Sequence, residues 1–129
     1  MWSGWPIPRI LLLFTAIAFV LIFVQVTLFH SRQNFRHWAM WGPVLETPLA
    51  FLLALALVFY NLSWLRTISG VVFVVGALSG VTGFVLHTQG VGQRVDGYSV
   101  QNFLVGPPIM LPLMVTALSL LGLIALFWR

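Results

Sequence analysis

Four long apolar runs, separated by short polar connections, decide what this chain can fold into. They cover residues 10–29, 43–60, 68–86 and 107–127. A helix that rises about 1.5 Å per residue needs about 20 apolar residues to cross the roughly 30 Å hydrocarbon layer of a membrane. The runs are continuously apolar, whereas strands of a membrane barrel would alternate in polarity. We therefore predict an all-α integral membrane protein, with four transmembrane helices in a single domain over residues 1–129.

The composition leaves little chain for a soluble domain. Hydrophobic residues make up 60% of the 129 residues and charged residues 6%, which is far from the balance of a soluble protein. Tryptophan prefers the headgroup level of a membrane, and the predicted spans place all six tryptophans at such levels. One face receives Trp2, Trp5, Trp64 and Trp128, and the other receives Trp38 and Trp41.

The basic residues are all arginines, and the formal net charge is +4. They lie near the ends of the predicted spans, where a long basic side chain can reach lipid phosphates. This distribution predicts contact with membrane lipids and gives no support for nucleic-acid binding. The arginines divide evenly between the two faces, so the positive-inside rule does not orient the chain. The free α-amino group favours cytoplasmic termini, and we expect a bacterial inner membrane.

Similar short sequence motifs recur in the two halves of the chain. Gln33-Asn34-Phe35 is matched by Gln101-Asn102-Phe103, and "GPVLETP" from Gly42 is matched by "GPPIMLP" from Gly106. In this alignment Met110 takes the place of Glu46, and Gly-Pro opens each even-numbered helix, since proline at the first helical position loses no hydrogen bond. The order of these motifs predicts two similar tandem hairpins. Because each hairpin has two spans, the copies would be related by a pseudo-two-fold axis along the membrane normal.

Small residues mark the third predicted helix for close packing. Gly76 and Gly80 form a small-xxx-small pair, which lets two helix backbones approach closely inside a membrane. The pair fits either the interior of this bundle or a contact with a partner. We favour the interior of the bundle, because the four helices must pack against one another.

Every histidine and both acids fall on one predicted face. The connections after the first and third spans carry or adjoin this group, which consists of His30, His37, Glu46, His87 and Asp96 with Arg32, Arg36 and Arg94. The opposite face has only the termini and one short link. A functional site, if the chain has one, is therefore expected on the face with the connections.

Three classes of function fit these features. The first is a non-catalytic membrane subunit that anchors or stabilises a larger complex through other membrane or peripheral subunits, and this is the function we predict. The second is an electron-transfer anchor that binds haem b or a quinone, with His30 and His87 as axial ligands. The third is a small transporter or channel that uses Glu46.

Other chemistry has less support in the sequence. The chain has no cysteine, which excludes disulfides, iron–sulfur clusters and covalently attached haem. It contains no nucleotide-binding loop, no HExxH and no nucleophile elbow. We therefore predict no catalytic residue, no metal site and no cofactor other than the alternative haem.

Glu46 is predicted to be a structural residue at the membrane rim. If Gly42-Pro43 begins the second helix, Glu46 lies in its first turn, where free backbone N–H groups and the helix dipole favour a carboxylate. Arg32, Arg36 and Arg94 are expected on the same face and offer charge partners. We therefore expect Glu46 to bond helix-start amides or an arginine, and we expect Glu46→Leu to weaken folding or docking.

Overall fold

The computed structural model describes residues 1–128, and all the regular structure in that range is helical. The long helices are α1 (Ile7–Arg32), α2 (Trp41–Phe59), α3 (Ser63–Gly92) and α5 (Met110–Phe127). A 3-10 turn, η1 (Trp38–Met40), precedes α2, and a short helix, α4 (Val100–Val105), precedes α5. The four long helices have the length and apolar composition needed to cross a membrane. The prediction of an all-helical protein with four membrane-spanning helices is therefore supported.

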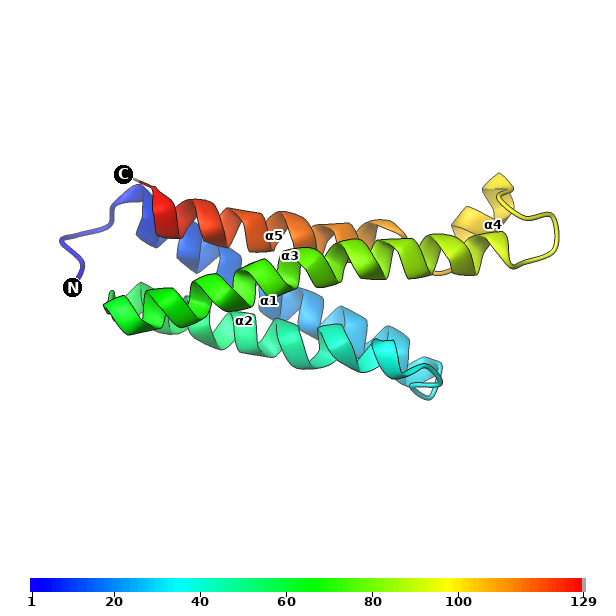
Figure 1. Ribbon diagram of the computed structural model, residues 1–129, viewed down its shortest axis with the longest axis horizontal. Helices are drawn as coiled ribbons and strands as arrows, with labels where there is room; N and C mark the ends of the chain where they lie inside the picture. Colours follow the sequence, from blue (N-terminus) through cyan, green and yellow to red (C-terminus); the bar gives the residue numbers. More distant parts are fainter. Residues whose placement is uncertain (129) are drawn as a thin grey trace.

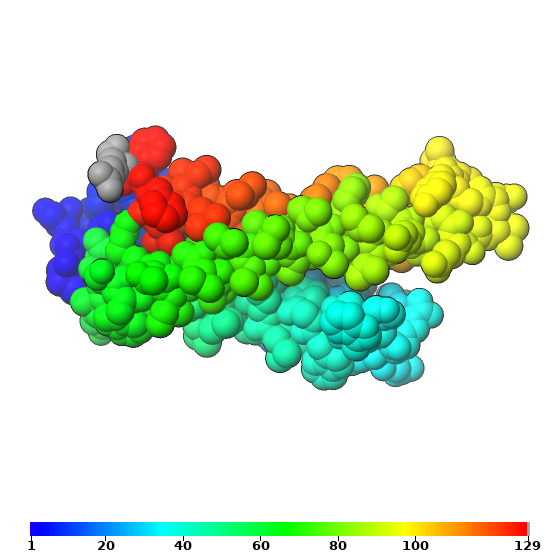
Figure 2. Space-filling model, viewed as in Figure 1, coloured from blue at the N-terminus to red at the C-terminus, as the bar shows by residue number. Residues whose placement is uncertain are grey.

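The helices form two antiparallel hairpins that pack side by side. Helix α1 pairs with α2, and α3 pairs with α5, while α1 also contacts α5 and α2 contacts α3 (Figure 1). Both chain termini lie at one end of the bundle, and the α1–α2 and α3–α5 connections lie at the other. The α3–α5 hairpin reaches further at the connection end, and a gap opens there between the hairpins (Figure 2). We call this end the connection end and the opposite end the terminal end.

Two phenylalanines join the hairpins at the centre of the bundle. Phe19 of α1 and Phe73 of α3 are both 0% exposed. Their rings stack with centroids 6.3 Å apart and planes 5° from parallel. Large apolar side chains on the outer helix faces remain exposed, among them Phe14, Leu21, Val71 and Leu78. In a membrane the lipid chains cover such faces, so their exposure in the isolated chain fits the four spans.

The α3 glycines bring two helices into close contact. Gly76 and Gly80 are buried, and a Cβ at either position would clash with atoms of α5. Across the same contact, the Thr116 hydroxyl of α5 donates a hydrogen bond of 2.8 Å to the Ala77 carbonyl of α3. The small-xxx-small pair therefore lies inside the protein's own bundle, between α3 and α5.

The prediction that Gly106-Pro107 opens the last long helix is wrong. Helix α5 begins at Met110, and Gly106 is extended with φ −81° and ψ −169°. A proline disfavours the helical conformation in the residue before it, so Pro107 and Pro108 keep Gly106 and Pro107 out of a helix. The first Gly-Pro behaves differently, because Pro43 lies within the first turn of α2. Helix α3, with 30 residues, extends beyond both ends of the apolar run 68–86.

The repeated tripeptide takes two different conformations. Asn34 and Phe35 have positive φ angles of 55° and 47°, in a turn that ends α1. Residues 101–103 instead lie in α4, where the Asn102 side chain donates 2.7 Å hydrogen bonds to the carbonyls of Val95 and Gly97. The shared letters therefore do not mark a shared local structure.

At the terminal end, one arginine in each hairpin ties its two helices together. Arg9, in the first turn of α1, donates a 2.9 Å hydrogen bond from Nε to the Val58 carbonyl in the last turn of α2. Arg66, in the first turn of α3, donates from Nη2 to the Leu126 carbonyl in the last turn of α5. A cation at a helix C-terminus satisfies free carbonyls and the negative end of the helix dipole.

Candidate functional site

Two histidines from different hairpins meet near the connection end. His30 is in the last turn of α1 and is 7% exposed, and His87 of α3 is half-buried. Their ring centroids are 6.4 Å apart, and the ring planes are 79° from parallel. The residues are far apart in the sequence, so the packing of the two hairpins alone brings them together.

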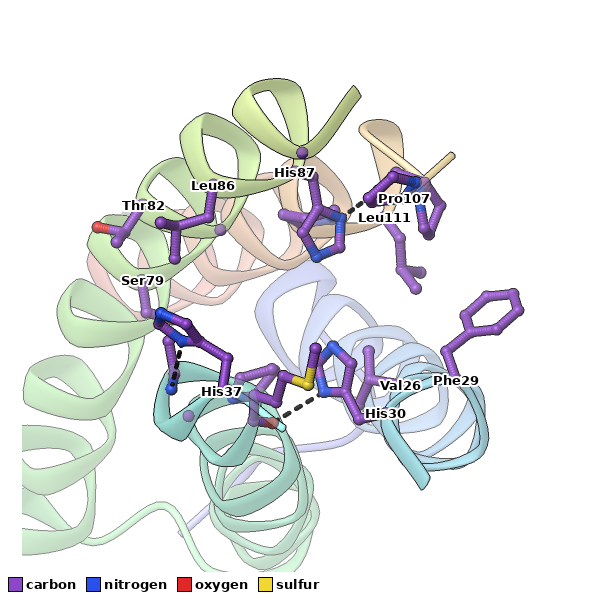
Figure 3. Close-up of a pocket in the computed structure, with 18 of the residues that line it drawn as sticks. Val26, Phe29, His30, His37, Ser79, Thr82, Leu86, His87, Pro107 and Leu111 are labelled. Carbon is purple, nitrogen blue, oxygen red and sulfur yellow. Dashed lines mark hydrogen bonds between the residues drawn. The ribbon is translucent and has the colours of Figure 1, made fainter. Parts of the chain in front are cut away.

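Each histidine is held by a hydrogen bond to a backbone carbonyl. His30 Nδ1 lies 2.8 Å from the Met40 carbonyl oxygen, and His87 Nδ1 lies 2.6 Å from the Pro108 carbonyl oxygen. A carbonyl only accepts hydrogen bonds, so Nδ1 of each ring carries the proton. In a neutral ring with this tautomer, Nε2 is unprotonated and can act as a ligand. Figure 3 shows these nitrogens pointing toward one another between the hairpins.

The histidines line a cavity between the hairpins. Its volume is about 810 Å³, and α1, α2, α3, α5 and the α1–α2 connection contribute to its walls. Its polar lining, besides the two histidines, consists of Gln33, Arg36, His37, Ser79, Thr82, Gln89 and Gln93. Much of the remaining wall is apolar, including Val26, Phe29 and Leu111 (Figure 3). An apolar cavity with a few converging polar groups is typical of a small-molecule or cofactor site.

Aromatic contacts hold the α1–α2 connection against His30. Phe35 packs edge-on to His30, with ring centroids 6.4 Å apart. Phe35 also stacks on Trp41 at the start of α2, with centroids 4.1 Å apart. His37 has a local role, because its Nδ1 accepts a 3.1 Å hydrogen bond from the Ala39 amide and caps η1. His30 and His87 are the histidines whose rings pair across the two hairpins in the described residues.

The structure contradicts the predicted bonds of Glu46 to helix-start amides or to an arginine. Both carboxylate oxygens are buried, and neither has a hydrogen-bond partner among residues 1–128. Helix α2 begins at Trp41, so Glu46 lies beyond the first turn and out of reach of its free amides. Arg32, Arg36 and Arg94 are exposed at the connection end, whereas the carboxylate faces α3 and α5.

Glu46 instead lies against the middle of the α3–α5 hairpin. A Cβ built on Gly76 would be 2.5 Å from Glu46 Oε1 and 2.5 Å from Ser119 Oγ. Gly76 is near the midpoint of α3, and Ser119 is near the midpoint of α5. Relative to these helices, the carboxylate is therefore central and not at the rim.

Sequence reasoning did not identify Ser119 or Ser69. Both are fully buried, and their hydroxyl groups have no hydrogen-bond partner within the part of the chain that the structure describes. Ser119 lies one turn before Gly122 in an otherwise apolar run, and this pair of small residues is the signal that would have marked the face of α5 toward α3. Ser69 is on α3 and has no comparable signal.

The described residues contain no group of three or more histidine, cysteine, aspartate or glutamate side chains able to hold a metal ion. His30 and His87 together offer two imidazole nitrogens, one from each hairpin. No protein-family model, no curated protein and no solved structure matches the chain.

Proposed function

We propose that this protein is a small membrane subunit for electron transfer, in which His30 and His87 are the axial ligands of a b-type haem bound between the two hairpins. The observation that carries the proposal is the pairing of these two rings at 6.4 Å, each with Nδ1 bonded to a backbone carbonyl. The proposal combines two of the functions considered from the sequence, the subunit of a larger membrane complex and the electron-transfer anchor.

The spacing of the rings fits one iron between them. With metal–imidazole bonds of roughly 2 Å, the two ring centroids on either side of an iron lie about 6 Å apart. The chain has no cysteine for covalent attachment, so a haem here would be the non-covalent b type. The gap between the hairpins at the connection end (Figure 2) provides the side along which a flat macrocycle enters.

The surroundings of the histidines also suit a haem. Metal-bound histidines commonly donate their second N–H to a carbonyl or carboxylate, which fixes the ring and raises its basicity as a ligand. The carbonyls of Met40 and Pro108 supply this bond. Arg36 lines the cavity near the membrane surface and can pair with the propionate groups that haem b carries. Apolar wall residues such as Val26, Phe29 and Leu111 suit the faces of the macrocycle.

The two hairpins have matching contacts, which supports an internal repeat. Arg9 bonds the last turn of α2, and Arg66 bonds the last turn of α5. His30 bonds the Met40 carbonyl directly before α2, and His87 bonds the Pro108 carbonyl shortly before α5. Arg9 precedes His30 by the same number of residues as Arg66 precedes His87. The two accepting carbonyls of each hairpin are also separated by the same number of residues, Met40 to Val58 in the first and Pro108 to Leu126 in the second. In this register Met114, and not Met110, corresponds to Glu46. A pseudo-two-fold axis would then run between the ligands.

The remaining parts of the proposal concern its setting. Haem in a small bundle needs an electron donor and an acceptor, which we assign to partner subunits, because residues 1–128 form little beyond the membrane helices. The connection end carries the exposed side chains Trp38, Val95, Val100 and Leu104, which suits docking of such a partner. We retain the proposed bacterial inner membrane and cytoplasmic termini, and we assign no catalytic step to this chain alone.

Optical spectroscopy tests the proposal directly. The protein is produced in haem-replete cells, purified in mild detergent, and examined by reduced-minus-oxidised difference spectra and by haem extraction. We expect one haem per chain with the spectrum of a six-coordinate, low-spin b-type centre. His30→Ala and His87→Ala should each lose the low-spin spectrum, whereas His37→Ala, which removes the third histidine of the cavity, should keep it.

Two controls make the result decisive. Circular dichroism and gel filtration establish that each variant is folded, and added imidazole should restore the low-spin spectrum of a folded His30→Ala protein. Folded wild-type protein that binds no haem from cells and none from added haemin would contradict the proposal. A folded His30→Ala protein with an unchanged spectrum would also contradict it.

A further inference from the structure

We infer that Glu46 is a proton-binding carboxyl group, which is buried in its neutral form and exchanges protons only with the cavity at the connection end. The inference rests on the position of this side chain between α2, α3 and α5, and it goes beyond the proposed haem. It would hold for the protein with or without a bound cofactor.

The surroundings of the carboxyl group favour its protonated form. Both oxygens are buried without a hydrogen-bond partner, and no charged side chain of residues 1–128 acts on them. A buried carboxylate without a partner is costly, and a neutral carboxylic acid is much less so. The acid form also gains an O–H donor. Ser119 Oγ, which has no partner of its own, lies across Gly76 from Glu46 Oε1 and is the available acceptor.

The titratable and charged groups of the neighbouring helices lie near the helix ends. Helix α5 has none. Helix α3 carries Arg66 in its first turn and His87 toward its end, and α1 carries Arg9 in its first turn with His30 and Arg32 in its last turn. Glu46 is the only such group within α2. Its protonation is therefore governed by burial and by Ser119, without a neighbouring charge.

The cavity provides access to Glu46 from one direction. Pro43, about one helical turn before Glu46 on α2, lines the cavity. Ser79 and Gly80, about one turn beyond Gly76 on α3, also line it. The carboxyl group is thus about one turn, or roughly 5 Å, deeper than residues that form the cavity wall. A proton can reach it from the cavity through a short displacement of side chains or one water molecule.

An aromatic layer separates Glu46 from the terminal end of the bundle. Phe73 lies one turn from Gly76 toward the terminal end, is fully buried, and stacks on Phe19 of α1. The Phe73 ring also fills the space over Gly122 of α5, where a Cβ would approach its carbons within 2.7 to 2.9 Å. Ser69, the next unpartnered hydroxyl group on α3, lies beyond this layer. Glu46 therefore stores a proton beneath the cavity and is not part of a path across the bundle.

A hydrophobic carbodiimide tests the protonation state. N,N′-dicyclohexylcarbodiimide adds as a whole to a protonated carboxyl group in apolar surroundings. The acid proton moves to one reagent nitrogen while a carboxyl oxygen bonds the central carbon. The acyl group then leaves that oxygen for the other nitrogen, which gives a stable N-acylurea. Mass spectrometry of the folded wild-type protein should find one added reagent, on Glu46. Glu46→Gln should lose this label completely, and Asp96→Asn, which removes the other acid, should keep it. Folded wild-type protein that shows no label on Glu46 would overturn the inference.

Reconstituted vesicles test the direction of access. A cysteine at Val95, in a protein that otherwise has none, reports which side the connection end faces. Raising the pH on that side should reduce labelling of Glu46, because deprotonation removes the reactive form, while raising the pH on the other side should not. Labelling that follows the pH of the terminal side would overturn one-sided access. Haem content, measured on the same samples, keeps this outcome separate from that of the proposed function.

Discussion

Replacing Gly80 with alanine should destabilise the bundle, because α3 and α5 are already in contact at this residue. A Cβ at Gly80 would lie 2.5 Å from the Pro112 carbonyl oxygen and 2.8 Å from the Thr116 amide nitrogen, and it would also clash with the Thr116 hydroxyl. The first two atoms belong to the backbone of α5 and cannot rotate away. The helices must therefore separate to accept a single methyl group.

The size of the effect follows from three contributions to the free energy of unfolding. Overpacking of a tight contact costs about 1–3 kcal/mol, and a rigid backbone neighbour places Gly80 toward the upper part of that range. Separation also strains the Thr116–Ala77 hydrogen bond, and such interhelical bonds are worth about 0.6 kcal/mol. Alanine recovers at most about 1 kcal/mol through its better helix propensity. The expected net loss is about 1.5–2.5 kcal/mol.

Gly70→Ala is the matched control in the same helix. The nearest atom to its added Cβ would be Leu126 Cδ1 at 3.7 Å, an ordinary contact, so only the propensity gain of about 1 kcal/mol remains. Equilibrium unfolding in mixed micelles, followed by circular dichroism, should therefore separate the two variants by about 2.5–3.5 kcal/mol. Equal stabilities, or a more stable Gly80→Ala protein, would refute the close α3–α5 packing at this residue.

Three further predictions address the core, the buried acid and the topology. Phe73→Ala should lower the free energy of unfolding by about 3–5 kcal/mol, because the ring is fully buried and stacked; a loss below about 1 kcal/mol in the same unfolding assay would contradict this role. Glu46→Met should raise stability by about 1–3 kcal/mol, since a buried carboxyl oxygen stays without a partner even when the O–H of the neutral acid bonds Ser119, and a destabilised variant would contradict this cost. Cysteines at the exposed positions Ser3, Ser31 and Val95, probed with an impermeant thiol reagent, should react at Ser31 and Val95 from one side and at Ser3 from the other; reaction of all three from one side would exclude four spans.

The expected effect of replacing Glu46 depends on how α2 is rotated about its own axis. From the sequence, Glu46→Leu was expected to weaken folding, because a carboxylate near a helix start and several arginines suggested a bond. The structure turns this face of α2 toward α3 and α5, where the carboxyl group meets Gly76 and Ser119. The effect expected for an apolar replacement therefore changes sign.

The two histidines show the opposite case, in which part of the site was visible in the sequence. Their positions near the ends of two odd-numbered spans placed them at one membrane face, and the structure brings them together across the hairpins. The sequence contained no sign of the carbonyls that hold them. Those carbonyls come from residues 40 and 108, whose positions depend on the conformations of the connections.

The sequence by itself determined the class of protein, the number of long helices and the end of the bundle where the histidines lie. These features follow from the thickness of the hydrocarbon layer and from the need to satisfy every backbone polar group within a helix. Only the tertiary structure decided which face of each helix points inward. In a membrane protein, lipid-facing and inward-facing side chains are both apolar, so the sequence carries little periodic signal of rotation. Close contacts at a few small residues, such as Gly76 and Gly80, decide it instead, and they place Glu46 at the centre of the bundle.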